Sequence, residues 1–138
     1  MASSNSKGWR CRAGRSDDGA TLAEFAFVLP VLLIILFAIF EFGLAFNRAQ
    51  AVEAAAREGG RLASLSTTSA GDVTNRVNAA LAGIPFQGPI NVSVSATCFG
   101  REGQPVTVTV TTVHTVNVPL VNSWPVNLSS QAVFRCEA

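Results

Sequence analysis

The sequence predicts an α+β protein, in which a long N-terminal membrane-spanning helix continues into a small extracytoplasmic domain with a short helix and a three-stranded, mainly antiparallel sheet. An apolar run of helical length lies near the N-terminus, a short amphipathic pattern follows it, and later runs alternate between apolar and polar residues. The chain has 138 residues, which leaves room for one small domain beyond the long helix.

The apolar run covers residues 25–46 and is interrupted by one acid, Glu41. A helix over these residues would be about 33 Å long, enough to cross a hydrocarbon core of about 30 Å. Pro30 removes one intrahelical hydrogen bond and should bend the helix. We therefore expect one membrane-spanning helix within residues 20–65.

The charges before the helix indicate its orientation. Basic residues lie within about 20 positions of the helix start, and such residues favour the cytoplasmic side; they are Lys7, Arg10, Arg12 and Arg15. We expect the N-terminus inside and residues 66–138 outside. Ordinary signal-peptide cleavage is a minor alternative, because the apolar run is longer than usual and the nearest small-residue site is Ala49-Gln50-Ala51.

Met1 to Asp18 is polar and has no helical or strand periodicity, so it is expected to be disordered. Cys11 lies in this stretch without a partner nearby, and one cysteine cannot make a zinc site alone. We interpret it as a reduced thiol in a leader.

Beyond the membrane, small residues recur every four positions at Ala51, Ala55, Gly59 and Ala63. Such rows let backbones approach closely, as they do between membrane helices. A partner helix or the protein's own sheet could fill this row, and alanine is also simply a good helix former.

Residues 72–82 are expected to form a short amphipathic helix, because apolar residues recur four apart at Val73, Val77 and Leu81. Ser69 or Gly71 would cap its start, and Gly83 would end it. Strands are then expected at residues 90–98, 106–118 and 126–136, each with one apolar face. This alternation is typical of an antiparallel sheet that is covered on one side.

Cys98 and Cys136 lie on apolar faces near strand ends. Outside the cytoplasm a disulfide between them is favoured over two buried thiols, and closing so long a loop would stabilise the domain by about 4 kcal/mol. In a simple meander, however, the first and third strands lie about 9.6 Å apart, whereas disulfide Cα atoms rarely exceed about 7 Å. Either these strands are neighbours, or the cysteines lie where the strands curl together.

Enzyme activity is not supported by the sequence. His114, the only histidine, sits on the apolar face of a strand, so a hydrogen-bonded core or rim residue is favoured over a catalytic base. The chain has no Ser-His-Asp arrangement, Gly-rich phosphate loop or metal-ligand spacing that can be argued, and we expect no cofactor and no metal. The net charge of +1 gives no argument for nucleic acid binding.

The acidic residues of the helix need an explanation. Glu24 lies at the mouth of the apolar run and Glu41 lies inside it. An ionisable group costs about 2.5 to 3.5 kcal/mol at mid-bilayer depth, so by default it has a partner or a function. Glu41 could reach the outer interface, pair with another subunit, or pair with Arg48 or Arg57, and the sequence leaves these alternatives open.

Specific motifs run in order through residues 19–65. They are Gly19-Ala20-Thr21-Leu22-Ala23-Glu24-Phe25, then Glu41-Phe42-Gly43 after the apolar run with Pro30, then Ala54-Ala55-Ala56-Arg57-Glu58-Gly59-Gly60-Arg61. In this order they resemble the TadE-like family, which are minor pilins or pseudopilins of the tight-adherence (Flp, type IVc) pilus systems. Related pilins often carry tyrosine where this chain has Phe25, and residues 66–138 resemble the family only in outline.

The resemblance implies that a prepilin peptidase cuts after Gly19, at a site that includes Glu24 and Phe25, and leaves Ala20 as the new N-terminus. In such pilins the glutamate of one subunit meets the free amine of its neighbour and sets the stagger of the packed helices. The implied partners are the peptidase, the major pilin, other minor pilins, the inner-membrane assembly platform and the lipid bilayer. The residues expected to take part in helix packing are Glu24, Glu41, Gly43, Ala51, Ala55 and Gly59.

The leading hypothesis is a single-pass inner-membrane pseudopilin, with leader residues 1–19 removed, a helix at residues 20–65 and an outer domain at residues 66–138. It would help to start or regulate a pilus, either from the membrane or within the fibre. The rival hypothesis is an uncleaved single-pass membrane protein whose outer domain binds a ligand or partner. Retention of residues 1–19 would favour that rival.

Overall fold

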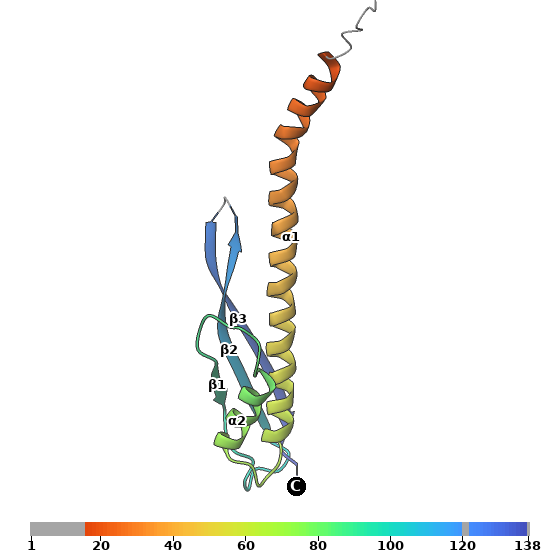
Figure 1. Cartoon of the computed structure of the whole chain (residues 1–138). Helices are drawn as coiled ribbons and strands as arrows, with labels where there is room; N and C mark the ends of the chain where they lie inside the picture. The colour runs from red at the N-terminus through yellow and green to blue at the C-terminus, as the bar shows by residue number, and fades with distance from the viewer. Residues whose placement is uncertain (1–15, 120–121, 138) are drawn as a thin grey trace, which may run out of the picture.

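The computed structural model describes residues 16–119 and 122–137, and it confirms the predicted α+β class (Figure 1). Its elements are α1 (Ser16–Ala63), α2 (Ala70–Ala80), β1 (Asn91–Val94), β2 (Pro105–Val118) and β3 (Asn122–Arg135). Helix α1 is a long rod, and the other elements gather beside its C-terminal half. The expected disordered leader, with Cys11, falls largely on residues 1–15, which lie outside the described residues.

Helix α1 is uninterrupted over 48 residues. It continues through Pro30, and Figure 1 shows its axis bending in the N-terminal third, as expected where proline removes a hydrogen bond. Its most apolar 18-residue window has a mean hydropathy of 2.8 and no buried residue, so the helix is long and apolar enough to cross a membrane. It begins at Ser16, before Gly19, and ends at Ala63, where the Ser64 hydroxyl donates to the Arg61 carbonyl at 2.8 Å.

The sheet is an antiparallel meander with strand order β1-β2-β3. Strand β3 starts at Asn122, earlier than the predicted position 126, because the β2–β3 ladder continues to the pair Val118 and Asn122. This ladder includes Pro125 opposite Thr115. Proline is tolerated there because β3 is an edge strand and its backbone can go without one donor.

Strand β1 covers Asn91–Val94 and is shorter than the predicted 90–98. The regular pairing ends at Ser95: its N–H donates to the Thr107 carbonyl, but its side-chain hydroxyl accepts from the Thr107 N–H, each at 2.9 Å. Because a side chain takes the place of the backbone carbonyl, the ladder stops and the chain can leave the sheet.

One face of the sheet packs against the C-terminal part of α1 and against α2. The even-numbered positions of β2 face this core as predicted, because strand side chains alternate between faces. The apolar residues buried here include Val52, Ala55, Ala56 and Ala63 of α1, Val73 and Val77 of α2, Leu81, and Val106, Val108 and Val110 of β2.

Helix α2 covers Ala70–Ala80 and begins two residues earlier than predicted. Ser69 is its N-cap and forms a capping box with Asp72, whose N–H donates to the Ser69 hydroxyl at 3.2 Å. The Ser69 hydroxyl and N–H donate in turn to the Asp72 carboxylate, and these hydrogen bonds hold the pKa of Asp72 below its usual value. Gly83, at φ +86°, follows the end of the helix.

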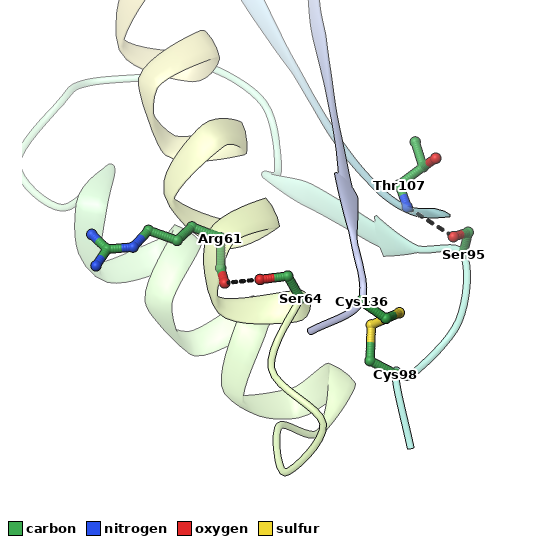
Figure 2. The surroundings of a disulfide bond; sticks show 6 residues. All are labelled: Arg61, Ser64, Ser95, Cys98, Thr107 and Cys136. Atoms are coloured by element: carbon green, nitrogen blue, oxygen red, sulfur yellow. Dashed lines mark hydrogen bonds between the residues drawn. A yellow bond between two sulfur atoms is a disulfide. The ribbon is translucent and has the colours of Figure 1, made fainter. Parts of the chain in front are cut away.

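A disulfide joins Cys98 to Cys136, with their Cα atoms 5.3 Å apart (Figure 2). The meander keeps β1 and β3 apart, and both cysteines lie just past the ends of these strands. Of the two arrangements that the sequence left open, the structure contains the second, in which the chain curls together beyond the strands. The Glu137 N–H then donates to the Ser64 carbonyl at 2.9 Å, which ties the end of the chain to the end of α1.

Candidate functional site

The residues of the predicted processing site lie near the N-terminal end of α1. Gly19, Ala20, Glu24 and Phe25 are helical and exposed. Ala20 and Glu24 are four residues apart, so they share one face of the helix. A Cβ added at Gly19 would meet nothing within 4 Å in the described part of the chain, so packing there gives no reason for a glycine. Glycine in a helix costs about 1 kcal/mol relative to alanine, which suggests a requirement set by another molecule.

Glu41 and Gly43 lie on different sides of α1. Glu41 is half-buried and interacts electrostatically with His114 of β2, so it faces the protein's own sheet. Gly43 is exposed, and a Cβ added there would meet nothing within 4 Å in the described structure. The arginines considered as partners of Glu41 bind elsewhere: Arg57 pairs with Glu53, and Arg48 binds His114.

The row of small residues on α1 is filled by the protein's own domain. Ala55 is buried, and a Cβ added at Gly59 would lie 2.6 Å from Cγ2 of Val77 and 3.4 Å from Cγ1 of Val108. Ala51 is half-buried against the same core. The expectation that Ala51, Ala55 and Gly59 pack against a partner helix is therefore corrected, because α2 and the sheet already occupy this face.

A polar cluster joins α1 to the sheet around His114, whose side chain is 1% exposed. Nη1 of Arg48 lies 2.7 Å from both ring nitrogens, and Oε1 of Gln87 lies 2.9 Å from Nδ1. A neutral ring fits both contacts, because Nδ1–H donates to Gln87 while Nε2 accepts from Arg48. His114 is thus a hydrogen-bonded core residue, as its place on the apolar face of the strand suggested.

Burial lowers the pKa of His114, the Arg48 charge lowers it further, and Glu41 opposes the shift. His114 therefore takes up a proton more readily in the unfolded chain than in the folded domain. The stability that neutral His114 contributes is complete above about pH 6.5, the pKa of the unfolded chain, and is lost as the pH falls toward the lower pKa of His114 in the folded domain. Unfolding of the full chain in detergent micelles should show stability declining as the pH falls below about 6.5.

The His114→Gln variant should show a smaller decline over this pH range. Asp72→Asn is a matched control, because the pKa of Asp72 is lowered from 3.8 and its effect belongs to more acidic conditions. Equal slopes for the wild type and His114→Gln would show that the pKa of His114 is the same in the folded and the unfolded chain, and would contradict the assigned shift.

A shallow depression between α1 and α2 is lined by Glu58, Arg61, Leu62, Leu65, Arg76 and Glu137. Arg76 and Glu58 form an ion pair across it. Among residues 16–119 and 122–137, no group of three His, Cys, Asp or Glu side chains could hold a metal ion. The depression pairs no nucleophile with a base.

Comparison with known proteins gives a match to a family model within the long helix. The family model described as TadE-like protein matches residues 19–61. Over these residues the chain is similar to TadE-like proteins. A search of curated proteins and of solved structures gives no match. The TadE-like segment indicates a pilin-like component of the Tad pilus system that is anchored in a membrane.

The TadE-like segment contains the predicted processing residues and most of α1, and the sheet domain lies beyond it. Sequence reasoning missed the partners of His114: Arg48 is 66 residues away and Gln87 is 27 residues away. It also missed Gly60, where an added Cβ would lie 2.6 Å from Cδ2 of Phe134. The adjacent glycines 59 and 60 within a helix were the available signal, because helical glycine without a close approach is unfavourable.

Proposed function

We propose that this protein is a minor pilin, or pseudopilin, that takes part in assembling a tight-adherence pilus through its N-terminal helix. A prepilin peptidase cuts after Gly19, and the new amine of Ala20 then lies one helical turn from Glu24 on the same face. The observation that carries the proposal is this spacing, at the mouth of an exposed apolar helix, within a segment that matches the TadE-like model from residue 19 onward.

The pairing of Glu24 has a physical basis. A carboxylate in a medium of low dielectric is costly alone and tolerable when it is paired and hydrogen-bonded. A free amine on a neighbouring subunit would supply the opposite charge at a similar depth, and so would fix the stagger of adjacent helices. Within a single chain, Ala20 and Glu24 are also close enough to interact before assembly.

Two parts of α1 differ in what covers their surface. The residues from Val52 to Ala63 include the face that packs on the protein's own sheet. The large apolar residues from Phe25 to Phe46 are mostly exposed, so lipid or other helices can cover them. Gly43 lies among these, on an open surface, and is the second contact that we assign to helix packing. The proposed partners are the major pilin, sibling minor pilins and the inner-membrane assembly platform.

Mass spectrometry of the native protein tests the processing step. In cells with an active prepilin peptidase the mature chain should begin at Ala20, and in cells without the peptidase residues 1–19 should be retained. A chain that keeps its leader beside an active peptidase would overturn the proposal and favour an uncleaved single-pass membrane protein.

Replacing Glu24 tests the assembly step. The Glu24→Ala variant should still insert into the membrane, but its amount in sheared pili should fall by about tenfold or more, because one charge of a buried pair left alone costs several kcal/mol. Glu53→Ala is the matched control, since Glu53 is exposed and pairs only with Arg57 among the described residues. Unchanged incorporation of Glu24→Ala would remove the assigned role.

A further inference from the structure

The β2–β3 hairpin lies beside a part of α1 that is also apolar enough to be in the membrane. Figure 1 shows the hairpin running along the helix toward its N-terminal end, with its tip level with the middle of α1. Burial follows the same line. Between residues 25 and 48, the side chains that are not exposed recur at spacings of four and three residues and so define one helix face; they are Ile34, Ala38, Glu41, Ala45 and Arg48.

The contacts of His114 give the level that the hairpin reaches. This residue binds Arg48 and interacts with Glu41, so it lies level with the helix between them. Strand β2 continues for four more residues to Val118, which is about 13 Å of strand. That length corresponds to about nine helix residues, so Val118 lies near the level of Leu36.

The membrane span of α1 has narrow limits. Asp18 precedes the apolar residues and Arg48 follows them, and the large apolar side chains of residues 25–46 are mostly exposed and need a cover. A hydrocarbon core of about 30 Å takes up about 20 helix residues, so even a layer that began directly after Asp18 would end near Ala38. The level of Leu36 therefore lies inside the hydrocarbon wherever the layer is placed between these charges.

A membrane-spanning α1 and a hairpin packed against it are mutually exclusive at this level. The end of the hairpin carries exposed Asn117, Asn122 and Ser123, and the outer edge of β3 is unpaired in the part of the chain that the structure describes. Lipid-exposed open sheet edges do not occur within the hydrocarbon region, because polar backbone groups find no water there. The end of the hairpin therefore has to leave α1 while the helix spans a bilayer.

The hairpin can part from α1 where the sheet narrows to two strands. Strand β1 pairs with β2 no further than Thr111, and two strands alone are only marginally stable. Just beyond that point Gln87 holds β2, because its Oε1 accepts from the Thr115 N–H at 3.1 Å and lies 2.9 Å from Nδ1 of His114. We call the part of the hairpin beyond this contact, residues 116–118 paired with residues 122–124, the strap.

The strap and lipid compete for the same face of α1. In a bilayer, lipid covers Ala38 and Ala45, and the strap stays outside the hydrocarbon with its polar groups. Without lipid, this face is covered by the strap, whose Val116 is 8% exposed and whose Val118 is half-buried. Burying these apolar side chains in place of leaving them in water favours the closed form.

We propose that the strap parts from α1 while the helix spans a bilayer and closes on it when the helix is withdrawn. The parting rests on the membrane anchorage of α1 and is independent of pilus assembly. Closing within a fibre rests on the proposed function, in which the subunit leaves the membrane. Gly43 stays exposed in the closed form, so the packing surface assigned to it is open in both states.

Distance measurements in bilayers of different thickness test the strap. The full chain with Cys11→Ser, Phe40→Cys and Asn117→Cys is spin-labelled at the two new thiols, which replace exposed side chains on α1 and on the strap. It is then reconstituted into vesicles of dilauroyl-, dioleoyl- or dierucoyl-phosphatidylcholine. A thin bilayer covers fewer helix residues and leaves room for the closed strap, whereas a thick bilayer does not.

Electron paramagnetic resonance should show the shortest distance between the labels in the dilauroyl vesicles. In the dierucoyl vesicles the distance should be longer by about 10 Å, because a strap that reaches about 13 Å beyond its base swings outward. The matched control carries Cys11→Ser, Asn75→Cys and Gln131→Cys, which place both labels at exposed positions of α2 and β3 in the outer domain. Its distance should be the same in all three lipids.

Two results would overturn the proposal. A short distance in all three lipids would show that the strap stays on α1 within the bilayer, and a long distance in all three would show that it does not close as described. Failure of the chain to float with the vesicles would remove the anchorage on which the parting rests. Retention of residues 1–19 in cells, or absence from sheared pili, would remove the proposed function alone, because these vesicles contain neither peptidase nor other pilins.

Discussion

Removing the disulfide should lower the free energy of unfolding of the outer domain by about 4 kcal/mol in the chain-entropy model. The bond closes a loop with a sequence separation of 38 residues. Both cysteines are buried, so the Cys98→Ala and Cys136→Ala double variant also loses packing. Denaturant unfolding of the full chain in detergent micelles, with and without reductant, measures the loss.

Cys11→Ser is the matched control for this prediction, because it removes a thiol that is not part of the bond. Its stability should equal that of the wild type under oxidising conditions and should fall as the wild type does when reductant is added. An unfolding midpoint that reductant leaves unchanged would contradict the role assigned to the bond.

The Gly59→Ala variant should lose about 1–3 kcal/mol of stability, because overpacking a filled core has this effect. The added Cβ would lie 2.6 Å from Cγ2 of Val77, and Val77 is itself fully buried. The loss occurs although alanine favours a helix by about 1 kcal/mol over glycine. Either α1 moves away from α2, or Val77 leaves its place against the sheet.

Gly71→Ala is the matched control within α2. Its Cβ would come no closer than 3.6 Å to the Ser69 hydroxyl, an ordinary contact. This variant should be as stable as the wild type or slightly more stable, since it gains helix propensity without a clash. If Gly59→Ala and Gly71→Ala gave equal stability by denaturant unfolding, α1 and α2 would not approach as closely as described.

The fold class could be predicted because it follows from local patterns. A run of apolar residues specifies α1, and the alternation of valine with threonine specifies which side of β2 faces the core. The predicted boundaries of the strands were less accurate. The early end of β1 depends on the Ser95 hydroxyl replacing a carbonyl, and the early start of β3 depends on a ladder that tolerates Pro125. Neither is visible in residue periodicity.

The candidate site was predictable only where it consists of neighbours in sequence. Gly19 and Ala20 are adjacent in one helix and Glu24 lies about one turn further on, so their spacing alone gives their relation. The surroundings of Glu41 could not be derived, because they depend on a strand that is more than 60 residues further along the chain and on the register that brings His114 beside Arg48. Which surface covers the row of small residues likewise depended on tertiary packing.

The continuity of α1 has a mechanical consequence. No loop separates the part of α1 that would sit in lipid from the part that packs against the sheet. Between Pro30 and the core, the helix therefore contains no hinge about which the sheet could move independently. Each residue of an α-helix turns about 100° around the axis. A change of one residue in the register of α1 against a neighbour would therefore swing the whole domain by about a quarter of a circle, and so change which of its sides the neighbour meets.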